Sequence, residues 1–389
     1  MTDRKDSFLM ATILDYVYWR GDLSLTQDPW RAADSAVLAS LCYLNPPEKG
    51  RSDEGLSLRE FALSLPEKGS GSLYEGRRTL CILAAGSRRF GDIRISRFVY
   101  NVNPEAGIQF AAFCAQLPDG VTAVCFRGTD ATLVGWREDF ELSYSSPVPA
   151  QTAAVDYLRD APGGRLILLG HSKGGNLAAY AASHVPTDVQ ARIEGIWSFD
   201  GPGLDEETAA SPGYAAVSGK IHSLIPQSSI IGLLMDYHPV YTIVRAEGAS
   251  LMQHNLHTWQ MDGPDFAVLQ DTTFSSQLMD RALHDWMRQA APEQRQLFVE
   301  SVFKVLQASG AVSVSDFRSL ELPQVARMAK AAAELEPETR KLVMQLFAGF
   351  FTAGASSAFA IGRDLLGINW AGPFLAKLNG GSEDGRMEG

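Results

Sequence analysis

Residues 165–182 constrain the fold of this chain more than any other stretch. An apolar run, Arg165–Leu169, leads directly into Gly170-His-Ser172-Lys-Gly174, and an alanine-rich segment follows as far as Ala182. A strand that turns at once into a helix leaves the central serine exposed at the carboxyl edge of a sheet, and the flanking positions approach neighbouring backbone too closely for a Cβ atom. The spacing therefore predicts a strand, a sharp elbow and a helix, with Ser172 as the candidate nucleophile.

The context of the motif carries more weight than its letters. A chain with 35 glycines can contain Gly-x-Ser-x-Gly by chance, so the bare pattern is weak. Here a strand-like run precedes it and a helix-like run follows, as the chemistry requires. A helix N-terminus supplies N–H donors and the positive end of a dipole where an oxyanion would form. We therefore expect the N–H of Lys173 to serve as one oxyanion donor.

Further short apolar or alternating runs lie on both sides of the elbow. They are Gln109–Gln116, Thr122–Phe126, Glu194–Phe199, Lys220–Ile225 and Tyr241–Arg245. Turn residues bound most of them, and segments with helical spacing lie between several. Buried runs that alternate with helices are typical of a parallel sheet covered on both faces. The predicted fold is an α/β-hydrolase-type, mainly parallel sheet with flanking helices, plus a helical C-terminal region.

The same patterns predict the organisation of the chain. We expect an N-terminal entry region at 1–75, the α/β core at 76–274, a helical region at 275–379 and a disordered tail at 380–389. Strand signals stop after about residue 275, and helical spacing takes over. Helices are expected at Ala33–Leu44, around Leu58–Leu65, and at Leu278–Ala290, Glu293–Ala308, Leu322–Leu335 and Pro337–Ala360.

A second chemistry-bearing stretch lies upstream, at Val124-Cys-Phe-Arg-Gly-Thr129-Asp130. A strand that ends in Gly-Thr can offer a backbone N–H and a hydroxyl to an oxyanion. Thr129 would then complete the oxyanion hole with Lys173. Taken alone, the stretch could also be an ordinary strand-to-turn transition, since glycine and threonine are common there.

These pieces together resemble class 3 (fungal-type) lipases and, more closely, the bacterial Mbeg-like family of α/β-hydrolases. The lipase-like pieces are Phe126–Asp130, Trp136, Asp139-Phe140 and Gly170–Ala178; the Mbeg-like pieces are Leu14–Asp22, Gly135–Phe140, Gly170–Ala178, Phe199–Gly203, Ile225–Ser229 and Gln253-His254. The resemblance implies an ester-cleaving fold without a settled substrate. Two departures stand out. Lys173 replaces the leucine of the lipases, and Ile225–Ile230 lacks the carboxylate that their corresponding D-x-V-P-type segment carries.

A serine nucleophile needs an imidazole base, which in this fold follows both the serine and the acid along the chain. Six histidines follow the elbow: His184, His222, His238, His254, His257 and His284. His254 and His257 lie in the expected place, after the strand Tyr241–Arg245. We expect His254 to be the base because the Gln253-His254 pair resembles the family pattern, and His257 is the reserve. His171, beside the nucleophile, is expected to pack or orient.

Two carboxylates compete for the role of triad acid. Asp200 ends the strand after the elbow helix, and the Gly-Pro-Gly that follows forms a sharp exit at the active edge of the sheet. Asp236 lies further on, before the last strand. We expect Asp200 to orient the imidazole, although Asp200 could also be a turn residue before Gly201.

Composition excludes several other classes of function. The formal net charge is −11 and no block of five basic residues occurs, which argues against a nucleic-acid partner. The four cysteines, Cys42, Cys81, Cys114 and Cys125, have no metal-ligand or disulfide spacing. We therefore predict no metal and no cofactor. Free thiols and an N-terminus without a signal-peptide pattern favour a cytoplasmic location.

The predicted function is a serine hydrolase that cleaves small-molecule or lipid carboxylic esters through an acyl-enzyme on Ser172. One alternative is an inactive hydrolase-fold binding protein, suggested by the missing lipase acid. Another is a membrane-associated, phospholipase-like enzyme, because Leu342–Gly362 has no charged residue over 21 positions. Its modest hydropathy favours a buried or interfacial helix, so membrane contact is the less favoured reading.

Overall fold

The computed structural model describes residues 11–67, 72–103, 108–129, 137, 141–142, 145–229, 231–233, 235, 240–248, 250–271, 290–311, 316 and 320–351. The chain divides into two compact units, one of residues 1–130 with 134–295 and one of 131–133 with 296–389. The boundary predicted at 274/275 and the tail predicted at 380–389 both lie outside the described residues.

The first unit is built on a large mixed sheet. In spatial order its described strands are β1 (Leu56–Ser57), β2 (Arg94–Asn103), β3 (Ile108–Gln116), β4 (Thr122–Phe126), β5 (Leu166–His171), β6 (Ile193–Phe199), β7 (Ile221–Pro226), β8 (Tyr241–Val244) and β11 (Val268–Leu269). Neighbours from β4 to β8 pair in parallel. The pairs from β1 to β4 and the pair β8–β11 are antiparallel. The predicted α/β-hydrolase-type fold is confirmed, with antiparallel strands at both edges.

The central strands are buried on both sides, which explains their unbroken apolar sequences. Every residue of β4 and β5 is buried. Side chains alternate between the two faces: Ile167 and Leu169 belong to one hydrophobic cluster, and Leu166 and Leu168 to the other. The strands β9 (Met261–Asp262) and β10 (Asp265–Phe266) pair with each other beside this sheet.

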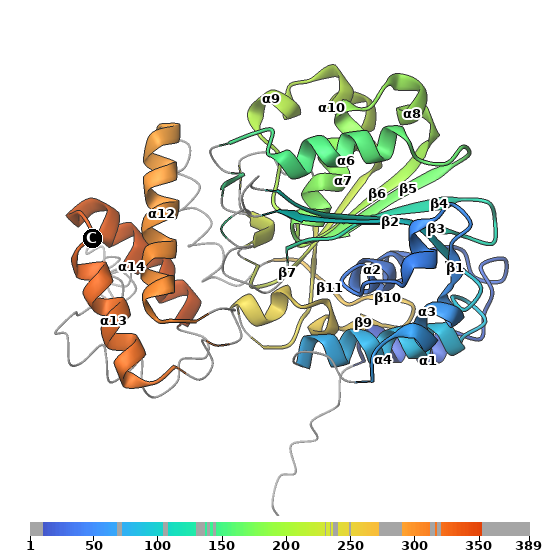
Figure 1. Cartoon of the computed structure of the whole chain (residues 1–389), viewed down its shortest axis with the longest axis horizontal. Helices are drawn as coiled ribbons and strands as arrows, with labels where there is room; N and C mark the ends of the chain where they lie inside the picture. The colour runs from blue at the N-terminus through green and yellow to red at the C-terminus, as the bar shows by residue number, and fades with distance from the viewer. Residues whose placement is uncertain are drawn as a thin grey trace, which may run out of the picture. The chain divides into compact units, whose positions relative to one another are not determined.

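One face of the sheet is covered by helices that follow the strands in sequence. Figure 1 shows α6 (Pro149–Arg159) and α7 (Lys173–His184) lying across it. The short helices α8 (Thr187–Arg192), α9 (Glu206–Ala209) and α10 (Pro212–Val217) lie on the same side. Alanines of α6 and α7 belong to the same hydrophobic cluster as Leu166 and Leu168, because small side chains let the helices approach the sheet closely.

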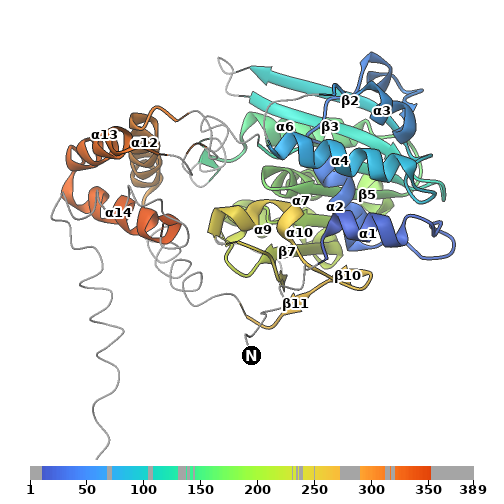
Figure 2. The same cartoon turned by 90° about the horizontal axis from the view of Figure 1, so that it is seen from below.

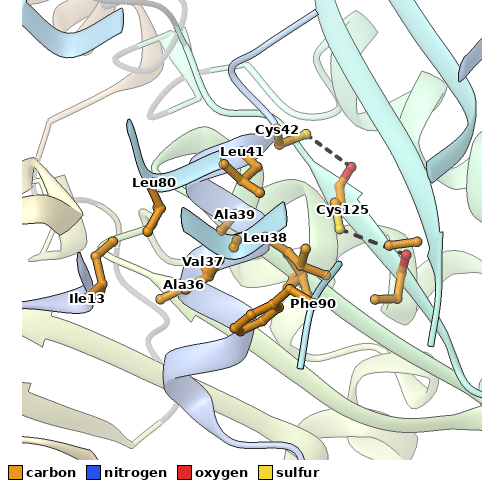
Figure 3. Packing of buried hydrophobic residues seen from close by; sticks show 14 of the residues in the cluster. Ile13, Ala36, Val37, Leu38, Ala39, Leu41, Cys42, Leu80, Phe90 and Cys125 are labelled. Atoms are coloured by element: carbon orange, nitrogen blue, oxygen red, sulfur yellow. Dashed lines mark hydrogen bonds between the residues drawn. The ribbon is translucent and has the colours of Figure 1, made fainter. Parts of the chain in front are cut away.

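The opposite face is covered by N-terminal helices, α1 (Ile13–Arg20), α2 (Ala32–Leu41) and α4 (Ser72–Gly86), as Figures 1 and 2 show. α1 and α2 lie in the predicted entry region and α4 lies mostly in the predicted core, and all three helices belong to the same compact unit as the sheet. Residues 33–41 of α2 are all buried, so α2 is a core helix rather than an amphipathic surface helix. Its C-cap residue, Cys42, donates a 3.5 Å hydrogen bond to the carbonyl of Cys125 in β4 (Figure 3).

A buried ion pair fixes these N-terminal helices to one another. Arg89 contacts Asp34 of α2 at 2.5 Å, and neither side chain is exposed. Tyr16 of α1 donates a 2.8 Å hydrogen bond to the same carboxylate. The guanidinium also donates to the carbonyl of Asp28 at 2.9 Å. Because both charges are paired and hydrogen-bonded, removal of either partner would leave a costly buried charge.

The second unit is helical where it is described. It contains most of α12 (Pro292–Ala308), together with α13 (Leu322–Ala333) and α14 (Pro337–Phe351), close to three of the predicted helices. The predicted helix Leu278–Ala290 lies almost wholly outside the described residues. Arg327 of α13 donates to the carbonyls of Ala308 and Ser309 at 3.0 and 2.8 Å, which caps the end of α12. Among the residues described, no helix is long and apolar enough to cross a membrane.

Candidate active site

Ser172 occupies a strained elbow between β5 and α7. Its backbone has φ 59° and ψ −136°, a conformation that non-glycine residues adopt only when the surroundings enforce it. Its N–H donates to the carbonyl of Phe199 at 2.9 Å. A Cβ atom on Gly170 would lie 2.2 Å from Gly174, and one on Gly174 would lie 2.2 Å from the carbonyl oxygen of Phe126. Both motif glycines are therefore required by close backbone packing.

The two residues predicted to hold an oxyanion both lie beside this elbow. Lys173 is the first residue of α7, so its N–H lies at the positive end of the helix dipole. Thr129 follows Gly128 at the end of β4, and a Cβ atom on Gly128 would lie 2.8 Å from the Cβ of Ser172. Both Lys173 and Thr129 are buried. The strand end and the helix start thus approach the serine from two sides.

Asp200 follows β6 and is 1% exposed. Its backbone also has a positive φ, 50°, which turns its side chain away from the strand path. One carboxylate oxygen, Oδ1, accepts hydrogen bonds from Ser229 Oγ at 2.5 Å and from the N–H of Gly232 at 3.1 Å. The other, Oδ2, accepts one from His254 Nδ1 at 2.6 Å. The acid and base that the sequence predicts are thus brought together.

His254 ends a short 3₁₀ helix, Ser250–His254, in the loop after β8. The neighbouring Gln253, 1% exposed, anchors this loop. Its Oε1 accepts from the N–H of Ser228 at 2.9 Å, and its Nε2 donates to the carbonyls of Ala246 and Gly248 at 3.1 and 2.8 Å. The Gln-His pair therefore has a physical role, because the glutamine holds the loop from which the imidazole extends.

His171, expected from sequence to pack or orient, is the last residue of β5 and directly precedes Ser172. Its Nε2 is 2.6 Å from the carbonyl oxygen of His254, and its Nδ1 is 2.8 Å from the hydroxyl of Tyr43. Burial lowers the pKa of His171 well below 6.5, and the neighbouring His254 lowers it further. The imidazole is therefore neutral near pH 7.

The side chains of the remaining candidates contact other groups, or the residues lie outside the described part of the chain. His257 Nε2 is 3.0 Å from Ser40 Oγ of α2, and burial lowers the pKa of this histidine to about 4. His184 Nδ1 bonds the carbonyl of Tyr180 within α7, and His222 stacks on Trp197. Asp236, His238 and His284 lie outside the described residues.

Two contributors to the site were not foreseen from sequence. Ser229 belongs to Ile225–Ile230, the segment that lacks the carboxylate found in lipases. It supplies a hydroxyl to a carboxylate that comes from the neighbouring strand end. Gly232 supplies an N–H to the same oxygen and has no room for a side chain, since a Cβ atom there would lie 2.5 Å from Asp200 Oδ1. The only sequence signal was the match of this segment to the family.

All these groups follow the carboxyl ends of adjacent parallel strands. Ser172 follows β5, Asp200 follows β6, Ser229 follows β7 and His254 follows β8. This edge is where α/β sheets generally bind ligands. A buried carboxylate bonded to Nδ1 fixes the imidazole tautomer, leaves Nε2 as the nitrogen for proton transfer, and stabilises the imidazolium once a proton is taken up. The arrangement brings a carboxylate-bound imidazole to the sheet edge at which Ser172 lies.

This chain is similar to one known protein family and to a solved structure. The Mbeg1-like family model matches residues 84–304, more than half of the chain. The chain belongs to the Mbeg1-like family. A solved structure similar to it is that of M37 lipase, at 14% sequence identity and a TM-score of 0.34, covering 53% of this chain and 70% of the lipase chain. No curated protein matches the sequence.

Proposed function

We propose that this protein is a serine hydrolase that cleaves carboxylic esters through an acyl-enzyme on Ser172. The observation that carries the proposal is the 2.6 Å hydrogen bond between His254 Nδ1 and Asp200 Oδ2, at the sheet edge where the strained elbow holds Ser172. A buried carboxylate that orients an imidazole beside an elbow serine is the arrangement that activates a hydroxyl for acyl transfer.

The proposed mechanism has two steps. His254 Nε2 removes the proton from Ser172 Oγ as the oxygen attacks the ester carbonyl. The main-chain N–H groups of Thr129 and Lys173 stabilise the tetrahedral oxyanion. The imidazolium then returns its proton to the departing alcohol, leaving an acyl-serine. Water, deprotonated by the same imidazole, attacks this ester, and the carboxylic acid leaves as Ser172 recovers its proton.

An inactive binding protein with the same fold is the second candidate. Its support was the missing carboxylate in Ile225–Ile230. That support weakens, because Asp200, at the end of β6, hydrogen-bonds His254. Ser229, from the segment that lacks the carboxylate, hydrogen-bonds Asp200.

For the substrate, we propose an ester with an apolar acyl chain, either a simple ester or a lipid. The support is the resemblance of the sequence Phe126–Asp130 to the oxyanion segment of lipases. A cytoplasmic location is part of the same proposal, since all four cysteines are free and buried, a pattern that suits a reducing compartment.

The decisive experiment is labelling of the full chain with a fluorophosphonate, which reacts with activated serines. Labelling of the wild-type chain and its loss in Ser172→Ala are expected, together with hydrolysis of p-nitrophenyl esters that disappears in the same variant. Undiminished labelling of Ser172→Ala would move the nucleophile elsewhere. A folded wild-type chain that neither labels nor hydrolyses esters would favour the binding protein.

A further inference from the structure

His171 makes two hydrogen bonds whose directions can be assigned from chemistry. A carbonyl oxygen only accepts, so the 2.6 Å contact with the His254 carbonyl requires that His171 Nε2 carries the proton. The Nδ1 of a neutral imidazole is then an acceptor, and it accepts a hydrogen bond from the Tyr43 hydroxyl at 2.8 Å. The two bonds select one tautomer and one ring orientation for His171.

Tyr43, the other member of this pair, is itself held from two directions. It follows α2, and the guanidinium of Arg77 in α4 lies over its ring, 3.8 Å from the centroid. A Cβ atom on Gly128 would lie 2.5 Å from the Tyr43 hydroxyl, so the hydroxyl packs against the strand end that carries Thr129. The tyrosine therefore touches the oxyanion strand, the residue before the nucleophile and the helical layer.

We infer that Tyr43 and His171 form a positioning pair that holds His254 in register with Ser172 by binding its main-chain carbonyl. This inference rests on the proposed hydrolase function. Asp200 controls the side chain of His254 through Nδ1, and His171 controls its backbone. The rings of His171 and His254 also lie 4.5 Å apart, tilted by 39°, so the pair restrains the base by packing as well.

The pairing has a geometric logic. His171 and Ser172 are consecutive at the end of β5. A hydrogen bond from His171 to the carbonyl of His254 therefore fixes the position of the base relative to the nucleophile. The loop that carries His254 lies 82 residues further along the chain (254 − 172), and the bridge between Ala246 and Trp259 closes its base. Misplacement of a catalytic group by about 1 Å can cost roughly a hundredfold in rate.

Three variants test this pair. His171→Leu removes the donor, His171→Gln retains an amide N–H at a reach similar to that of Nε2, and Tyr43→Phe removes a single oxygen. We expect His171→Leu to lower kcat on a p-nitrophenyl ester about tenfold with little change in KM. His171→Gln should recover most of that loss, and Tyr43→Phe should lower kcat about fivefold. Rates are expressed per active site titrated with the fluorophosphonate, which corrects for unfolded chain.

A second background separates positioning from a purely structural role. In His254→Ala, the additional His171→Leu substitution should change the residual rate by less than about twofold, because no base remains to be positioned. Equal losses in both backgrounds would mean that His171 acts on the elbow itself, and the inference would be wrong. Full kcat in both His171→Leu and Tyr43→Phe would overturn it as well.

A failure of the underlying function gives a different result. If Ser172→Ala, measured in the same series, hydrolyses the ester as fast as the wild type, then Ser172 is not the nucleophile and the proposed function is wrong. If Ser172→Ala is inactive but the His171 and Tyr43 variants keep the wild-type kcat, only the inference about the positioning pair is wrong.

Discussion

The two carboxylate oxygens of Asp200 have different partners: Oδ2 accepts a 2.6 Å hydrogen bond from His254 Nδ1, whereas Oδ1 accepts from Ser229 and Gly232. Both oxygens act as acceptors. An asparagine at this position has one acceptor and one donor, so it cannot satisfy both sides. With two donors facing Oδ1, the amide oxygen would turn there and the NH₂ group would face the imidazole.

Asp200→Asn is therefore expected to force the wrong tautomer on His254, with the proton on Nε2. We expect kcat to fall by about three to four orders of magnitude while the protein stays folded. Asparagine is among the residues that best tolerate a positive φ, here 50°, so the backbone can be retained. The measurement is steady-state hydrolysis of one p-nitrophenyl ester, with circular dichroism to verify folding.

Asp236→Asn, measured beside Asp200→Asn, is the matched control, since Asp236 was the competing candidate from sequence. It should keep near-normal turnover. If Asp236→Asn is crippled while Asp200→Asn turns over almost normally, the assignment of the acid is wrong and the roles are exchanged.

Ser229→Ala tests whether the segment after β7 supports the acid. The substitution removes one of the two donors to Oδ1 and leaves the N–H of Gly232. A hydrogen bond to a charged group contributes about 1.5–3 kcal/mol, so we expect kcat/KM to fall at least about tenfold. Ser229→Thr keeps a hydroxyl, so its kcat/KM should fall less. Equal activity of Ser229→Ala and wild type would show that Gly232 suffices.

The elbow and the parallel strands were predictable because their signals are local. The apolar run Arg165–Leu169, the glycines at 170 and 174 and the alanine-rich helix are contiguous, and each has a steric reason. Asp200, His254 and His257 were nominated because strand ends must meet at one edge of a parallel sheet, and the resemblance of Gln253-His254 to the family pattern favoured His254. Asp200 follows β6 and His254 follows β8, so their hydrogen bond joins two strand ends that flank the end of β7.

The rest depended on contacts that local spacing does not encode. Tyr43 reaches His171 across 128 positions of sequence, from a segment predicted as an entry region. α2 has apolar residues on every side, and without a partner in view its place on the sheet could not be inferred. β2 was missed because its register shifts between Ser96 and Val99, which breaks the alternation that identifies a strand.

Asn176 of the elbow helix ties α7 to the loop after the acid. Its Nδ2 donates to the carbonyl of Gly203 at 2.6 Å, and its Oδ1 accepts from Gln151 of α6 at 3.0 Å. Asn176→Ala would leave both partners buried without these bonds. We expect a loss of about 2–3 kcal/mol in the free energy of unfolding, measured by urea denaturation, with a smaller effect on kcat.

Asn176→Asp sharpens that test, because the carboxylate still accepts from Gln151 but cannot donate to the Gly203 carbonyl. It should destabilise the protein at least as much as alanine, since two oxygens then face each other in a buried site. If Asn176→Asp were as stable as wild type, the bond to Gly203 would have no role in holding the loop.

His257 makes stability depend on pH in a defined direction. Burial lowers its pKa to about 4, with a further contribution from Arg77, whereas an unfolded histidine titrates near about 6.5. Between these values the unfolded chain binds more protons than the folded one. Stability from this group is therefore present above about pH 6.5 and is lost as the pH falls, by up to about 2 kcal/mol at pH 5.

The variant that isolates this effect is His257→Gln, whose amide can still hydrogen-bond Ser40 but does not titrate. His171 and the carboxylates are present in both proteins, so most of their contribution is removed from the difference; His257 is only the smallest of the causes that lower the pKa of His171. Urea unfolding at pH 7 and pH 5 should show that the wild type loses more stability than His257→Gln, by about 2 kcal/mol at most. Equal losses of stability in the two proteins would mean that His257 is protonated in the folded protein at pH 5 and that burial does not keep it neutral.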